Sequence, residues 1–360
     1  MKRPALATLG VLVALAWVVA AAAAERRAAT RTTDGGIAIE NLDHQIAQPG
    51  DAGSVDLLLA RARFLADYRA LNRASVLAEQ RSATAADLVQ RARARSAVHR
   101  FADALADLDA AERRGASAEA VEGLRASILV ATGRAAEAVP LLEAGLARRP
   151  EFASRSALAV AYASLGRLDE ADRLYARALE DLDTTLPFPY AWTCFARGMM
   201  WAEQGGDRER AAGHYARALE YLPDFAAAGI HLAELDVARG DTAAALARLE
   251  RVVRSSGEPE ALALLGRLHT RLGDAVRGAD EITRARQTFE TLLSRQPLAF
   301  ADHAAEFYLG AGADPERAWE LARMNLANRP TERALALAVW AAEASGRPAD
   351  AYALLATRHP

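Results

Sequence analysis

The chain has 360 residues, of which 52% are hydrophobic, and its 44 basic and 47 acidic side chains give a formal net charge of −3. This balance offers no basic surface of the kind that binds nucleic acid or anionic membranes. The single cysteine, Cys194, excludes a disulfide within the chain. Because Cys194 lies in the apolar run AWTCFARGMMW, we expect it to be a small core residue.

The N-terminus has the features of a targeting segment. Lys2 and Arg3 precede an uncharged, mostly apolar run over residues 4–24, which ends in three alanines before Glu25. This pattern predicts a secretory signal peptide over residues 1–24. The same run is long enough to cross a bilayer as an uncut helix, so a signal anchor stays open as the alternative. In both cases we expect the rest of the chain outside the cytoplasm, either periplasmic or exported, or anchored in the inner membrane by the N-terminus.

Residues 25–53 mix charged residues with Gly-Gly and Pro-Gly pairs and show no helical period. Such composition is typical of a flexible linker. We therefore predict that residues 25–53 join the targeting segment to the remainder of the chain, residues 54–360, without packing on it.

From residue 85 onward a small anchor residue recurs at steps of 34, 33, 40, 34, 40, 33 and 33 positions. The anchors are Ala104, Ala138, Ala171, Ala211, Ala245, Ala285, Ala318 and Ala351. A period in this range predicts stacked helical hairpins. Glycines five positions before an anchor predict a break between two helices where a positive φ is needed, and prolines twelve positions after one predict the end of the second helix.

The small anchor lets two helices approach closely, and a large residue four positions later lies on the same helical face. The residues predicted to pack each repeat in this way, with their punctuating glycine and proline, are Gly133, Ala138, Leu142, Pro150, Ala171, Tyr175, Ala211, Tyr215, Ala245, Leu249, Ala285, Phe289, Ala318 and Ala351.

These Gly, Ala, Tyr/Leu and Pro positions resemble the tetratricopeptide repeat family, as do Leu262, Leu265 and Gly266 in a first helix. The resemblance implies an all-α fold: a right-handed solenoid of about eight helix-turn-helix repeats with terminal caps, preceded here by the N-terminal apolar helix. The expected units are residues 54–84, 85–118, 119–151, 152–184, 192–223, 226–257, 259–297, 299–330 and 331–360. The two steps of 40 predict insertions near residues 183–190 and 274–282, each either a loop or a longer helix.

Catalytic and metal-binding patterns are absent from the sequence. None of the seven histidines pairs with another at metal-ligand spacing, and no HExxH, CxxC, GxSxG or P-loop motif occurs. His303 beside Asp302 is the one suggestive pair, and we interpret it as a solvated helix start. We therefore expect no catalytic residue, no metal and no cofactor, and we predict that the protein is not an enzyme.

The resemblance implies that the first helices of the repeats line a concave groove. The family's groove positions correspond to Ser127, Val130, Val160, Met200, Glu203, Ile230, Glu234, Arg267 and Arg271. The alternative is that the apolar members only pack against neighbouring helices. A groove with an apolar half and a charged half predicts a scaffold or adaptor that binds a peptide or helix of another exported or envelope protein. A membrane-anchored structural subunit of an envelope complex stays open as the second hypothesis.

Overall fold

The computed structural model describes residues 32–48 and 54–356, and all the regular secondary structure in these ranges is α-helical. The all-α prediction is therefore confirmed, whereas the predicted apolar helix over residues 4–24 lies outside the described residues. None of the described helices is long and apolar enough to cross a bilayer. The helices are α2 (Gly35–Ala47), α3 (Ser54–Leu65), α4 (Tyr68–Glu79), α5 (Ala85–Ala97), α6 (Phe101–Arg113), α7 (Ala118–Ala131), α8 (Ala135–Arg148), α9 (Phe152–Ser164), α10 (Leu168–Glu180), α11 (Phe188–Glu203), α12 (Arg208–Tyr221), α13 (Ala226–Arg239), α14 (Thr242–Ser256), α15 (Pro259–Arg271), α16 (Ala275–Arg295), α17 (Pro297–Leu309), α18 (Pro315–Asn328), α19 (Glu332–Ala344) and α20 (Pro348–Ala356).

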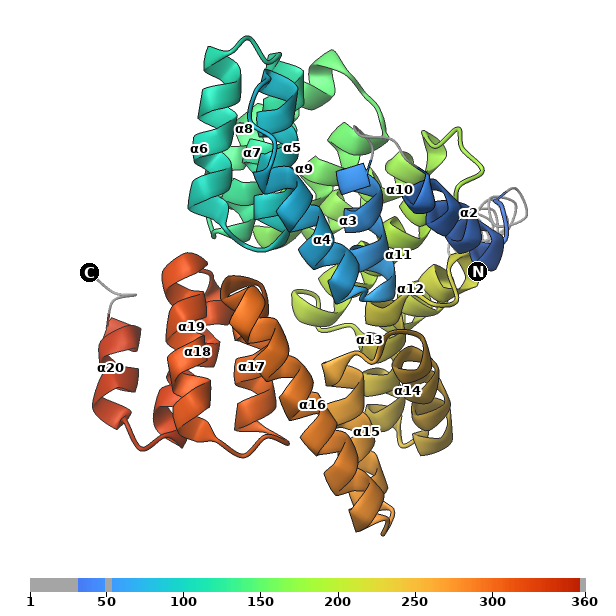
Figure 1. The fold of residues 1–360 in the computed structure, drawn as a ribbon, viewed down its shortest axis with the longest axis vertical. Helices are drawn as coiled ribbons and strands as arrows, with labels where there is room; N and C mark the ends of the chain where they lie inside the picture. Colours follow the sequence, from blue (N-terminus) through green and yellow to red (C-terminus); the bar gives the residue numbers. More distant parts are fainter. Residues whose placement is uncertain (1–31, 49–53, 357–360) are drawn as a thin grey trace, which may run out of the picture.

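From α3 onward the helices pack as successive hairpins, α3 with α4 through to α19 with α20, and each hairpin packs on the next (Figure 1). Local chemistry sets where the helices begin and end. Asp207 and Asp241 accept hydrogen bonds from free N–H groups at the starts of α12 and α14. The predicted glycine breaks have positive φ angles, as at Gly133 (+77°) and Gly240 (+85°), which a side chain would disfavour.

The anchor alanines lie at the helix contacts within the hairpins, and each is at most 3% exposed. The large residues four positions later fill the adjacent space, with Tyr175, Tyr215 and Phe289 all 1% exposed. A side chain larger than alanine at an anchor would push the paired helices apart. The regular spacing of alanines along the chain therefore becomes a regular spacing of helices in the array.

The middle of the predicted linker differs from the prediction. Residues 35–47 form helix α2, whose first N–H groups, those of Gly36 and Ile37, donate to the Asp34 carboxylate. Ala38 and Leu42 are buried, and the backbone of Gly35 lies so close to Tyr221 that a β-carbon there would be 2.7 Å from its carbonyl oxygen. The tertiary contacts stabilise a helix that local composition does not favour.

The two insertions have different structures. Around residues 274–282 the extra length is helical, because α16 runs unbroken over 21 residues. Gly278 and Gly266 let α15 and α16 cross closely there, since a β-carbon on Gly278 would lie 2.6 Å from the carbonyl oxygen of Gly266. Around residues 183–190 the chain forms a loop before α11, and the Thr185 carbonyl accepts a hydrogen bond from the Thr33 N–H at 2.7 Å.

The array curls until its two halves touch. In Figure 1 the last hairpins, α17 to α20, come back beneath α4 to α6. Here the His99 imidazole contacts the carbonyl oxygen of Leu298 at 3.1 Å, and Asn328 donates to the His99 carbonyl at 2.9 Å. Arg329 donates to the carbonyl of Ala131 at 3.3 Å, at the end of α7. We call these contacts the seam, and they close the solenoid into a ring.

The close contact of α11 with α12 can be tested at a glycine. A β-carbon on Gly198 would lie 2.5 Å from the buried Tyr215 ring, so Gly198→Ala should lower the free energy of unfolding by about 1–2 kcal/mol although alanine favours helix. Gly213 lies in the next helix with no atom within 4 Å of its β-position, so Gly213→Ala should instead raise the free energy of unfolding by about 0.5–1 kcal/mol. Urea unfolding followed by circular dichroism measures both, and equal effects of the two changes would contradict this packing.

The seam should weaken in acid. Burial, helped by the nearby Arg329 charge and opposed by Asp302, lowers the pKa of His99 from 6.5 to about 4. The neutral imidazole is therefore the folded form, and its contribution is complete above pH 6.5 and is lost as the pH falls through about 4. His99→Asn keeps a donor for Leu298 and suits the positive φ of +58°, but it cannot titrate. Between pH 6.5 and 4.5 the wild type should lose about 2 kcal/mol of unfolding free energy relative to this variant. Parallel pH profiles of the two proteins would rule His99 out as the cause.

Candidate functional site

The concave face of the array is partly filled by the chain itself. The turn between α3 and α4, residues 64–68, reaches across the interior of the array, and we call it the inserted corner. Its Phe64 side chain lies 5.1 Å from Phe188 and 5.0 Å from Phe225, measured between ring centroids. Phe64 is only 6% exposed. An aromatic side chain buried in this way contributes several kcal/mol, so the first hairpin is held firmly inside the curve.

A second contact of the same corner reaches α15 and α17. The Tyr68 ring meets Phe300 edge-on at 5.0 Å, and its hydroxyl donates to the Glu258 carboxyl at 3.0 Å. Burial raises the pKa of Glu258 to about 8, although the Ala261 N–H also donates to it. Between these two contacts Ala66 adopts a positive φ of +50° and packs with Ile230. The corner therefore occupies the concave side of α13, α15 and α17.

The His303–Asp302 pair belongs to this filled region. The His303 imidazole lies 2.5 Å from the Glu260 carboxylate, whose charge raises the pKa of His303 well above its usual value. Asp302 is bound by Arg329 at 3.1 Å and also lies 3.8 Å from the His303 imidazole, so the groups form one network of opposite charges. This arrangement links α15, α17 and the segment after α18. The interpretation of this pair as a solvated helix start is wrong, because both residues lie in the middle of α17 and Asp302 is buried. The ion pairs give these residues a structural role.

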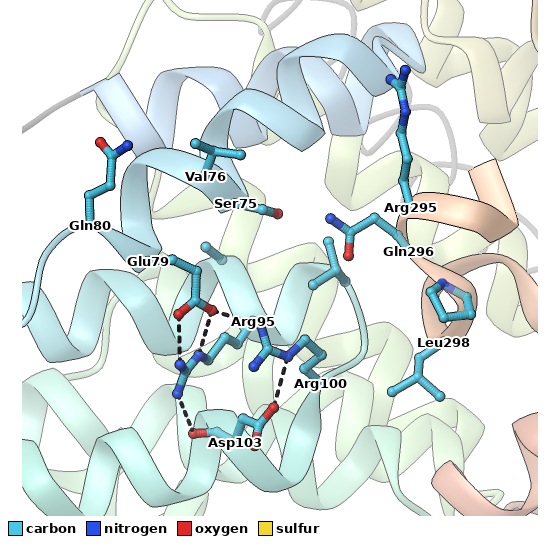
Figure 2. A pocket seen from close by; sticks show the side chains of 13 residues that line it. Ser75, Val76, Glu79, Gln80, Arg95, Arg100, Asp103, Arg295, Gln296 and Leu298 are labelled. Atoms are coloured by element: carbon cyan, nitrogen blue, oxygen red, sulfur yellow. Dashed lines mark hydrogen bonds and ion pairs between the residues drawn. The ribbon is translucent and has the colours of Figure 1, made fainter. Parts of the chain in front are cut away.

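A cavity of about 620 Å³ lies at the seam, between α4 and α5 on one side and the α16–α17 junction on the other. Figure 2 shows four of its five charged groups bonded to one another, whereas Arg295 points away from them. Glu79 holds Arg95 at 2.8 Å and Arg100 at 2.7 Å, and Arg100 also binds Asp103 at 2.8 Å. The hydrogen bond from Arg95 lowers the pKa of Glu79, so the network stays ionised. The charges of these four groups cancel, which leaves Arg295 as the one charged residue of this cavity outside the network.

A second cavity, of about 420 Å³, opens on the concave side of α7, α9 and α11 beside the inserted corner. We call it the groove cavity. Its walls are mostly apolar, and Arg63 is the one charged residue among them. The lining residues are Arg63, Phe64, Ser127, Val130, Leu142, Phe152, Ala153, Ser156, Ala157, Val160, Phe188, Pro189 and Trp192. A concave, mostly apolar site with a few polar groups is the usual form of a binding site.

Three of the predicted groove residues, Ser127, Val130 and Val160, meet in the groove cavity. Met200 and Ile230 lie elsewhere and are buried, at 2% and 4% exposed, so neither offers a surface to a ligand. The burial of Ile230 has a clear cause, because Ala66 and Tyr68 of the inserted corner pack in its cluster.

The four predicted charged groove residues do not meet at one site. Glu203 lies 3.5 Å from Arg333, and Glu234 lies 3.0 Å from His231 within its own helix. Arg267 and Arg271 are exposed on α15. The family positions therefore coincide with a cavity only at Ser127, Val130 and Val160.

Sequence reasoning missed several lining residues. Phe188 lies within the first insertion and Trp192 just after it, and Arg63 and Phe64 come from a hairpin whose repeat pattern is degenerate. Only the shape of the array brings these segments together. Across the described residues, no three His, Cys, Asp or Glu side chains are grouped as metal ligands would be.

Comparison with known proteins agrees with this fold. Tetratricopeptide repeat profiles match residues 153–190 and 203–268. No curated protein matches the sequence. Among solved structures, the human IFIT1 dimer with PPP-AAAA is similar over 89% of this chain and 77% of that one, with 16% identity and a TM-score of 0.52.

Two further structures are more distant. The APC/C hetero-tetramer Cut9-Hcn1 matches with 15% identity and a TM-score of 0.47 over 84% of this chain, which spans only 59% of that chain. A tetratricopeptide repeat protein from Parabacteroides merdae matches with 15% identity and a TM-score of 0.42 over 71% of this chain and 98% of that one. At these identities the likeness concerns the fold alone. The profile matches identify tetratricopeptide repeats at residues 153–190 and 203–268, and the other hairpins share the same helical-hairpin fold.

Proposed function

We propose that the protein is a non-catalytic scaffold that binds a helix or extended segment of a partner protein in the groove cavity. The observation that supports this most directly is the open apolar cavity on α7, α9 and α11, beside the part of the concave face that the inserted corner between α3 and α4 fills. Exposed apolar surface in a concave site loses its hydration cost when a partner's apolar side chains enter it. Tetratricopeptide repeats suit such a role because stacked first helices present one continuous surface.

Binding in the groove cavity can be tested with a phage-displayed library of random dodecapeptides. The purified protein should enrich sequences with large apolar residues at helical or alternating spacing. Val160→Asp places a carboxylate on the apolar wall and should reduce retention of the enriched peptides by about tenfold or more. Val276→Asp makes the same change at a side chain that is 85% exposed on α16 and should have no effect.

Ser127→Trp provides a second variant if the aspartate disturbs folding. Ser127 is exposed within the cavity, so tryptophan there fills the space without burying a charge. It should block the same peptides while the thermal melting curve stays unchanged. Enriched peptides that bind all three variants equally would show that they use another surface.

We further propose that the scaffold acts outside the cytoplasm on another exported or envelope protein. The support is the charged start and apolar run of residues 1–24, followed by small residues. The same run supports the second candidate, a structural subunit of an envelope complex that is anchored by an uncut N-terminus.

N-terminal sequencing of the protein from fractionated cells separates the two candidates. We expect a mature chain that begins at Glu25 and is recovered with the soluble envelope fraction. An intact Met1 in the membrane fraction would favour the anchored subunit. Recovery of the intact chain from the cytoplasm would contradict both.

A further inference from the structure

We propose that the partner segment carries a carboxylate beside its apolar side chains, and that Arg63 of α3 pairs with this carboxylate at the groove cavity. This inference rests on the proposed function and adds the chemistry of the partner. It assigns a binding role to the first hairpin, which lies outside the regular repeat pattern.

Arg63 lacks the acidic partners that hold two nearby arginines. Arg61, two positions earlier, is held by Asp43 and by Asp67, and Arg91 is held by Asp107 at 2.6 Å. Arg63 lines the groove cavity, and no acidic side chain among the described residues pairs with it. Its guanidinium is therefore available to a ligand in the cavity.

The surroundings of Arg63 would strengthen such a pair. Arg63 shares the groove cavity with the Phe64 and Phe188 side chains, and its side chain stays exposed to solvent while desolvation by the surrounding chain lowers its pKa below the value usual for arginine. A charged group that has lost part of its hydration gains more from an opposite charge than one in open water. A carboxylate also matches the planar guanidinium, which can donate two parallel hydrogen bonds to it.

A second polar group in the cavity lacks a partner. The Ser156 side chain is 4% exposed, and its hydroxyl makes no hydrogen bond in the structure. Buried hydroxyls without partners are uncommon, and Ser156 lines the same cavity as Arg63. A bound segment would satisfy both groups if it offered a carboxylate to Arg63 and a separate hydrogen-bond acceptor to the Ser156 hydroxyl.

Other ligand classes fit the cavity less well. A single arginine among apolar walls cannot follow the repeated phosphates of a nucleic acid. A free phosphate or other small anion would leave the apolar walls of Val130, Val160 and Trp192 uncovered. A basic segment would place its charge against Arg63. The apolar walls and the lone positive charge together specify an acidic, amphipathic peptide.

The test uses two pools of synthetic dodecapeptides, labelled with a net-neutral rhodamine dye. Both pools carry Leu and Phe at helical spacing, and the remaining positions are Glu and Ala in one pool but Gln and Ala in the other. Fluorescence anisotropy at physiological salt should show about tenfold tighter binding of the Glu pool, the effect of one charge-assisted hydrogen-bonded pair. The protein's net charge of −3 repels the Glu pool at long range. A preference for that pool must therefore come from a positive group at the binding site.

Three variants assign the preference to one side chain. Arg63→Gln should bind both pools with the affinity that the wild type has for the Gln pool. Arg208→Gln removes an exposed arginine at the start of α12, away from the cavity, and should keep the preference. Arg63→Glu should reverse it toward a third pool with Lys in place of Glu. Reversal by charge exchange also excludes a merely structural role of Arg63.

The outcomes separate this inference from the proposed function. A preference for the Glu pool that survives in Arg63→Gln, or no preference in the wild type, overturns the role of Arg63 and leaves the groove cavity as a binding site. Equal binding of the Gln pool to the wild type and to Val160→Asp overturns the groove cavity itself. Failure of all pools to bind the wild type overturns both.

Discussion

The structure depends on the close approach of two helices at a buried alanine. At Ala138, Ala171, Ala211 and the other anchors the side chain is fully or almost fully buried, and the residue four positions later fills the remaining space. Each hairpin can cover its apolar face only by packing on the next. The same small residue at each crossing gives successive hairpins similar geometry, and the repetition of one local contact produces a curved array.

Closure of that array has consequences for its concave face. Once the seam brings Leu298 and Asn328 to His99, the interior of the curve is narrow enough for one corner of the chain to fill it. Phe64 and Tyr68 supply that corner, and the Tyr68–Glu258 bond fixes its position. The part of the face left open lies between the corner and α7, α9 and α11. The candidate site is therefore a product of closure as much as of the repeats.

The sequence predicts the features that depend on local contacts. The period of Ala and Gly identifies helices, turns and buried anchors because each involves residues within one hairpin, as Gly133 and Ala138 illustrate. Closure joins residues far apart, such as His99 with Leu298, 199 positions away, and Tyr68 with Glu258, 190 positions away. No periodic signal marks such pairs. For this reason the family's groove positions predict the cavity at Val130 and Val160 but not the burial of Ile230 or the presence of Arg63.

Closure and ligand binding are consequently linked. Arg63 reaches the groove cavity only because the neighbouring Phe64 is docked between Phe188 and Phe225. A ligand that pairs with Arg63 binds the state in which the first hairpin is docked, and not a state in which the hairpin is released. Ligand binding and docking therefore stabilise each other by the same free energy. The corner that blocks most of the concave face would then also be the element that gives the remaining site its charge specificity. A partner selected by this site would stabilise the closed array and would not open it.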